Sequence, residues 1–268
     1  MDSGLSHELL GVAFGMIVGV SLGLTGGGGS IFAVPLLTYG LGVPVGTALG
    51  LSLASVGATA GFGAALRLRA REIELQGGLI FSVVGMVAAP IGAMIGHRIA
   101  SATLLSAFAV MMGYVGMRMW CERTGAPVRS GPCVTQGKGK LTAGCYAMFS
   151  IAGAASGLLS GLFGVGGGCV IVPSLLYVGI KIHRAVATSL MVIFLISVSG
   201  VVANIVQGQQ FPVRVTALFL GGCFAGMLAA SALRFRLSGS VLQKTFAVAM
   251  WLVALFMLVK NLSTFSPR

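Results

Sequence analysis

The sequence is short of charged side chains. Only 8% of its 268 residues are charged, whereas a soluble domain carries about 25%. So little charge could not cover a folded surface in water, which excludes an ordinary soluble domain. The chain is 56% hydrophobic and has several apolar runs near the roughly 20 residues that a helix needs to cross a bilayer. We therefore predict an all-α polytopic membrane protein.

Acidic residues are the scarcest charged group. The five of them fall in expected loops or at the ends of apolar runs, at Asp2, Glu8, Glu72, Glu74 and Glu122. Pumps and cation carriers usually keep a carboxylate inside the membrane. The absence of one, with a net charge of +12, favours an anionic substrate. The basic residues lie between apolar runs, as membrane topology requires, so we predict a lipid bilayer and a small anionic solute as partners and no nucleic acid. A homo-oligomer is left open.

The motifs of metal sites and of several enzyme classes are also missing. The five cysteines form no CxxC or CxxH pair, so neither metal binding nor a disulfide is expected of them. No GxSG or HExxH motif is present, and His7, His97 and His183 are scattered near expected membrane surfaces. We predict no enzyme, no metal and no cofactor. An intramembrane enzyme with a paired Ser and His stays as a third hypothesis.

A tandem repeat organises what is present. The phrase GLTGGGGSIFAVPLL at 23–37 returns as GLFGVGGGCVIVPSL at 161–175, and an offset of 138 gives nine identities in seventeen positions. We predict a first transmembrane repeat at 1–120, a basic loop at 121–140 and a second repeat at 141–268. The expected apolar segments are 9–24, 30–42, 45–66, 77–96 and 101–120, then 143–163, 169–180, 185–206, 213–233 and 241–260.

The distribution of Lys and Arg bears on how the two halves are oriented. If 9–42 is one broken helix, each half crosses four times, the halves run parallel, and the cations divide eleven to six. If it is a re-entrant hairpin or two short spans, the halves are inverted and the cations divide thirteen to four. The positive-inside rule favours inverted repeats, with both termini extracytoplasmic.

The glycine-rich stretches 26–30 and 164–168 interrupt the most apolar part of each half. Irregular backbone survives in a membrane only against protein or a water-filled cavity, and Gly allows positive φ and close approach of a ligand. The helix that restarts after each break offers N–H groups to an anion, and Pro35 and Pro173 are expected to kink it and free a carbonyl. Such breaks at matching positions of inverted halves are typical of the binding site of a secondary transporter.

Hydroxyl groups near the breaks are candidates to complete the site. Ser52 and Ser189 match across the repeat, at an offset of 137. Scattered glycines such as Gly15 and Gly113 are expected only to let helices pack closely, and Arg67 is expected at the membrane interface. The predicted substrate-binding residues are Thr25, Gly26, Gly27, Gly28, Gly29, Ser30, Pro35, Ser52, Gly164, Gly166, Gly167, Gly168, Pro173, Thr188 and Ser189.

The doubled G-L-x-G-x-G-G…V-P phrase, each copy followed by a Ser-Leu pair, resembles the TauE/SafE family of sulfite-exporter-like transporters. APIGAMIGHRI at 89–99 also looks like the glycine-rich helix of that family. The second copy departs from the first at Val165, which stands where the first has Gly27. The resemblance implies a multi-pass protein of the inner (cytoplasmic) membrane that moves sulfite, organosulfonates or related organic anions. The family motif falls on Gly26, Gly28, Gly29, Pro35, Gly164, Gly166, Gly167 and Pro173.

Together these features predict a secondary transporter of small anions, working as an exporter by rocking of its two halves. The alternative is an anion-selective channel in which the Gly-rich breaks act as the filter.

Overall fold

The fold was analysed in a computed structural model of the chain, which describes residues 2–68, 73–121, 143–177, 182–209, 212–233 and 239–265. These ranges contain helices and no strand. The predicted loop at 121–140 lies almost wholly outside the described residues.

Each half contributes the same series of helices. In the first half these are α1 (Asp2–Thr25), the irregular segment η1 (Gly28–Phe32), α2 (Ala33–Pro35) and η2 (Leu36–Gly40), then α3 (Val45–Leu68), α4 (Leu75–Arg98) and α5 (Ser101–Cys121). In the second half they are α6 (Ala143–Phe163), α7 (Gly168–Tyr177), α8 (Ile182–Val206), α9 (Val213–Leu233) and α10 (Gly239–Phe265). The predicted segments are confirmed, with ends shifted by a few residues. Two segments differ from the prediction. The helix expected at 9–24 begins earlier, at Asp2, and the segment expected at 30–42 is the irregular stretch 28–40.

Within the described residues, six helices are long and apolar enough to cross a membrane. Their outer faces carry large apolar side chains; Val83 and Val87 on α4, for example, are 60% and 67% exposed. Such a surface would be unstable in water but suits a lipid environment. The chain is therefore a multi-pass α-helical membrane protein.

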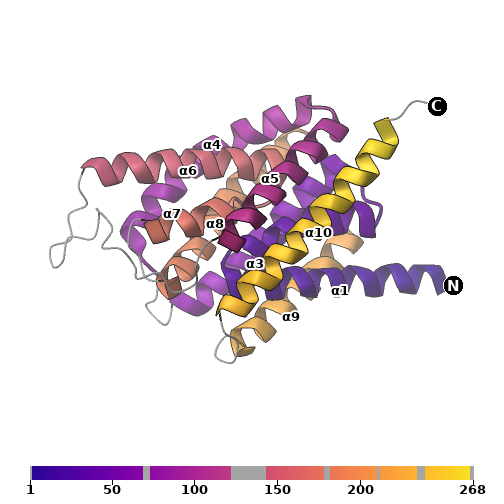
Figure 1. Ribbon diagram of the computed structural model, residues 1–268, viewed down its shortest axis with the longest axis horizontal. Coiled ribbons are helices and arrows are strands. Elements are labelled where there is room, and N and C mark those ends of the chain that lie inside the picture. The colour runs from indigo at the N-terminus through magenta and orange to yellow at the C-terminus, as the bar shows by residue number, and fades with distance from the viewer. Residues whose placement is uncertain are drawn as a thin grey trace.

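The two halves are interlocked, because each main helix pair combines one helix from each half. α1 packs along α9 of the other half, and α6 packs along α4, while α3 contacts α8 and α5 contacts α10 (Figure 1). Glycines permit the close backbone contact: a Cβ on Gly19 would lie 2.1 Å from the Cys223 carbonyl oxygen, and one on Gly157 would lie 2.3 Å from that of Gly85. The packing role predicted for Gly15 is confirmed, but that of Gly113 is wrong, because no atom lies within 4 Å of its Cβ position.

The residues in contact show whether two packed helices run parallel or antiparallel. Gly57 faces Ser197 and Gly61 faces Phe194, so α3 and α8 run antiparallel. Gly15 lies against Phe219 and Gly19 against Cys223, so α1 and α9 run parallel. Helices at equivalent places in the two halves therefore cross the core in opposite senses at α3 and α8.

Aromatic residues of α5 and α10 cover the two interrupted segments. The Phe32 and Phe246 ring centroids are 6.0 Å apart, and those of Phe108 and Phe163 are 5.4 Å apart.

At the start of α6, Cys145 is disulfide-bonded, which contradicts the expectation that the cysteines are small apolar residues without a disulfide. Cys223, by contrast, is free and buried.

Candidate functional site

The two Gly-rich breaks meet inside the protein although 138 residues separate equivalent positions. A Cβ on Gly27 would lie 2.5 Å from Cα of Gly168, and one on Gly168 would lie 2.4 Å from Cα of Gly27. Real side chains do not come so close, so only glycine at both positions allows this contact. The structure thus brings together the two segments that the sequence singles out.

The breaks end α1 and α6 in the same way. Gly26 adopts φ 72° and Gly164 adopts φ 66°. The Gly26 amide donates to the Leu22 carbonyl at 2.8 Å, and the Gly164 amide donates to that of Ser160 at 2.9 Å. A residue with positive φ after the last helical turn is the usual way to stop a helix, and Gly adopts it without strain.

Ser52 and Ser189 each reach across to the break of the opposite half. The Ser52 hydroxyl donates to the Gly164 carbonyl at 2.8 Å, and the Ser189 hydroxyl donates to the Gly26 carbonyl at 2.5 Å. Both serines are fully buried. These two side chains therefore hold the backbone of the breaks, and in this conformation their hydrogen atoms point to protein carbonyls.

The first break is closed by its own hydrogen bonds. The Gly29 amide donates to Oγ1 of Thr25 at 3.2 Å, and the Ser30 amide donates to the Gly27 carbonyl at 3.3 Å. The Ser30 hydroxyl donates to the same carbonyl at 2.6 Å. Several amides expected to face an anion are thus already paired inside the protein, so an anion would meet them only after the break rearranges.

The two prolines lie in different surroundings. Pro35 ends α2 and is followed by the wider π-helical turn η2, whereas Pro173 lies inside the short helix α7. The restart of a short helix after the second break is therefore confirmed. The kink and free carbonyl expected at each proline remain a prediction.

Two residues make contacts that the sequence did not suggest. Oγ1 of Thr188 accepts a hydrogen bond from the Glu74 amide at 2.9 Å, at the start of α4, so this hydroxyl supports a helix end and not a break. Arg67, which was expected at the membrane interface, is buried inside the protein: it is only 8% exposed, and its Nη2 donates to the Gly23 carbonyl at 3.0 Å. A positive charge therefore lies beside the last turn of α1, just before the first break.

Buried hydroxyls surround the second break, and the sequence analysis missed them. The side-chain oxygens of Ser156, Ser160 and Ser197 have no hydrogen-bond partner in the described part of the protein, and each residue is at most 1% exposed. A Cβ on Gly166 would lie 3.6 Å from Oγ of Ser197, and one on Gly167 would lie 3.2 Å from Cβ of Ser156. Leaving a buried hydroxyl unpaired costs about 1–3 kcal/mol. Such groups are the available donors for an anion at this point.

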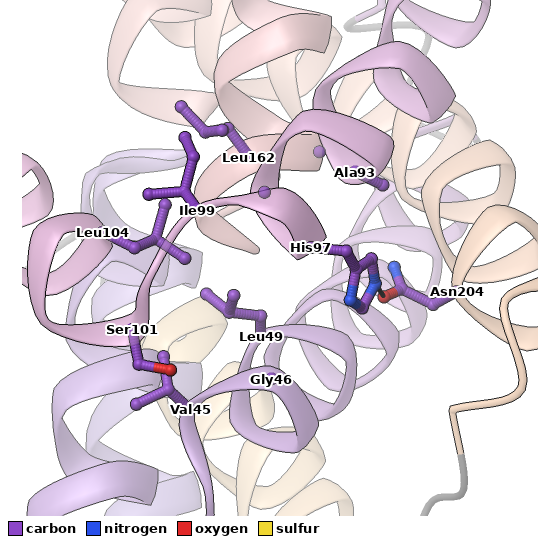
Figure 2. Close-up of a pocket in the computed structure, with 12 residues that line it drawn as sticks. Val45, Gly46, Leu49, Ala93, His97, Ile99, Ser101, Leu104, Leu162 and Asn204 are labelled. Atoms are coloured by element: carbon purple, nitrogen blue, oxygen red, sulfur yellow. Dashed lines mark hydrogen bonds between the residues drawn. The ribbon is translucent and has the colours of Figure 1, made fainter.

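A cavity of about 90 Å³ lies at the end of α6, just before the second break (Figure 2). It lies where α3 begins and where α4, α6 and α8 end. Gly161 and Leu162, at the end of α6, form part of its wall, and so does Leu49, whose carbonyl oxygen is 2.5 Å from the Cβ position of Gly164. The polar side of the cavity holds His97 and Asn204. The breaks themselves are buried beyond it and in contact with each other.

An interlocked helical membrane protein with paired breaks and an adjoining cavity is of the transporter class. Comparison with known proteins agrees. The model of the family described as Sulfite exporter TauE/SafE matches residues 11–257, so the chain belongs to this family.

Three relatives support the assignment, and each is named a probable membrane transporter protein. One from Xylella fastidiosa (strain 9a5c) is 30% identical over 256 residues, covering 93% of this chain and 94% of the relative. YdhB of Bacillus subtilis is 31% identical and covers 78% and 85%. MJ0441 of Methanocaldococcus jannaschii is 29% identical and covers 74% and 73%. The chain is therefore a membrane transporter.

Proposed function

We propose that this transporter moves small anions, of the class of sulfite and organosulfonates, out of the cytoplasm across the inner membrane. The observation that carries the proposal is the meeting of Gly27 and Gly168 beside the unpaired hydroxyls of Ser156 and Ser197. Hydroxyl and amide donors of this kind suit a negatively charged solute. The family description, Sulfite exporter, supports both the substrate class and the direction.

The two halves are proposed to be inverted repeats. The antiparallel contact of the equivalent helices α3 and α8 supports this arrangement, because it reverses the direction of crossing between halves. The thirteen-to-four division of Lys and Arg supports extracytoplasmic termini. Inverted halves that meet at broken helices suit alternating access around a fixed site, here with a local rearrangement of the breaks, because each break is held by a serine of the other half.

A carrier fits the closed contact between the breaks better than a channel does. Gly27 and Gly168 are in contact, so a solute cannot pass between them in this conformation. A substrate must instead be admitted from one side, through the cavity beside Gly161, and released after a rearrangement. Binding through backbone and hydroxyl groups requires no metal or cofactor.

Counterflow in proteoliposomes tests the proposal. Vesicles loaded with unlabelled sulfite, methanesulfonate, acetate or chloride are diluted into a trace of the labelled anion. A carrier accumulates label transiently above equilibrium, whereas a channel only dissipates the gradient. Absence of flux for every anion would refute the anion proposal, and flux without counterflow would favour the channel.

Serine variants test where the anion binds. Ser156→Ala and Ser197→Ala remove hydroxyls that have no partner, so we expect stability to hold or rise by about 1 kcal/mol while anion flux falls at least tenfold. Ser231→Ala is the control, since the Ser231 hydroxyl is exposed and donates to the Leu228 carbonyl on α9. Unchanged flux in both variants would place the binding site elsewhere.

A further inference from the structure

The cavity beside the second break has one polar side and one apolar side. In Figure 2 the His97 ring and the Asn204 amide face each other, and Leu49, Leu104 and Leu162 lie across from them. At about 10–15 Å³ for each water-sized volume, 90 Å³ is large enough for a compact anion of a few atoms. Such a ligand would touch the polar pair and the apolar wall together.

A hydrogen bond with Asn204 orients the His97 ring. Nδ2 of Asn204 donates to the Gly200 carbonyl at 2.8 Å, which orients the amide so that its Oδ1 faces Nε2 of His97 at 3.2 Å. An amide oxygen only accepts, so Nε2 carries a hydrogen. Nδ1 is the ring nitrogen that does not face Asn204. Asn204 is 4% exposed and holds the ring in place.

Few charged groups line the cavity around His97. The α3, α5, α6 and α8 residues that line the cavity include no acidic or basic side chain, and on α4 His97 is the one titratable residue among the lining residues described. His97 and the following residue, Arg98, are both exposed. Glu8, on α1, forms an ion pair with Arg214 on α9.

From these observations we infer that the cavity is a binding site for a small anion, and that the anion is recognised by the imidazolium form of His97 held by Asn204. Binding therefore takes up a proton at Nδ1 when the ring starts neutral, and the proton and the anion enter together. Histidine is the side chain that ordinarily changes charge between pH 5 and 8. The inference rests on the proposed anion transport, to which it adds a recognition residue and a proton.

The test uses methanesulfonate, which stays a monoanion throughout this pH range, so that any pH dependence belongs to the protein. Binding to the purified full-length protein is measured by calorimetry at pH 5.5 and 8.0, in buffers of different ionisation enthalpy that report proton uptake. We expect binding at least tenfold tighter at pH 5.5, with net proton uptake as the pH approaches neutrality.

Three variants separate the roles. His97→Gln keeps a donor for Asn204 but cannot gain charge, so affinity at pH 5.5 should fall at least tenfold and proton uptake should vanish. Asn204→Asp retains the ring but sets a carboxylate against it, so it should weaken methanesulfonate binding by a similar factor. His7→Gln, the matched control, should behave as the wild type.

The outcomes distinguish the inference from the proposed function. Wild-type binding that is independent of pH, or a His97→Gln protein that keeps the wild-type pH profile, would overturn the inference while leaving anion transport intact. A wild-type protein that neither binds nor transports any anion of the panel would overturn the proposed function itself. The wild-type measurement decides even where a variant fails to fold.

Discussion

Adding one methyl group where the breaks touch is the most direct perturbation of this architecture. In Gly168→Ala the new Cβ would lie 2.4 Å from Cα of Gly27 and 2.8 Å from its carbonyl carbon. Ordinary contacts between such atoms begin near 3.4 Å, so one break must move by about 1 Å. The atoms in the way belong to buried backbone and cannot rotate aside as a long side chain would.

The cost follows from overpacking of a dense interior, which is typically about 1–3 kcal/mol. We take about 2 kcal/mol for Gly168→Ala, which corresponds to a fall of roughly 4–8 °C in Tm for a protein of this size. Because movement of one break also displaces the carbonyls held by Ser52 and Ser189, anion flux should fall at least tenfold.

The assay is differential scanning fluorimetry of the purified protein with counterflow on the same preparation. Gly221→Ala is the matched control, because it adds the same methyl group to α9, where no atom lies within 4 Å. There the variant should be unchanged or stabilised by up to about 1 kcal/mol, since Ala loses less backbone entropy than Gly. If Gly168→Ala and Gly221→Ala were alike in both Tm and flux, the breaks would not be in the contact described here.

Three further substitutions address single hydrogen bonds. Ser189→Ala leaves the buried Gly26 carbonyl without its donor, and should cost about 1–3 kcal/mol and reduce flux; a wild-type Tm would contradict this. Thr188→Val removes an acceptor at a helix start, so Tm should fall by a few degrees while the order of preference among anions, read by competition, stays the same. Arg67→Met removes the guanidinium that donates to the Gly23 carbonyl, and should lower the stability of the protein by about 1.5–3 kcal/mol. An unchanged Tm in fluorimetry would show that this hydrogen bond does not stabilise the protein.

The helices and the candidate breaks were predictable because their signals are local. Apolar runs of bilayer length are bounded by short polar loops, so the limits of α3 and α9 agree closely with prediction. The repeat showed that the two breaks occupy equivalent positions. The match between Ser52 and Ser189 across the repeat indicated that these two serines have a role at the breaks. The structure adds that each serine binds the break of the other half.

The cavity and the unpaired hydroxyls were not predictable because they depend on packing between halves. His97 and Asn204 are 107 residues apart and meet only because α4 packs against α8. The burial of Arg67 was not predictable because it ends an apolar segment, and in sequence such a residue cannot be distinguished from one that extends to the membrane surface. Ser156 and Ser160, one helical turn apart just before the break, are the part of this cluster whose spacing is visible in the sequence.

The reciprocal attachment of the breaks constrains how transport can proceed. Each break ends a helix of one half but is held by a serine of the other, so neither half can move as a unit without disturbing the Ser52 or Ser189 hydrogen bond. An anion also cannot pass between Gly27 and Gly168 while they are in contact. The proposed cycle therefore requires the breaks to rearrange locally, and glycine at both positions makes this possible because its backbone can move between positive and negative φ at little cost. A rigid rotation of two intact halves would not suffice.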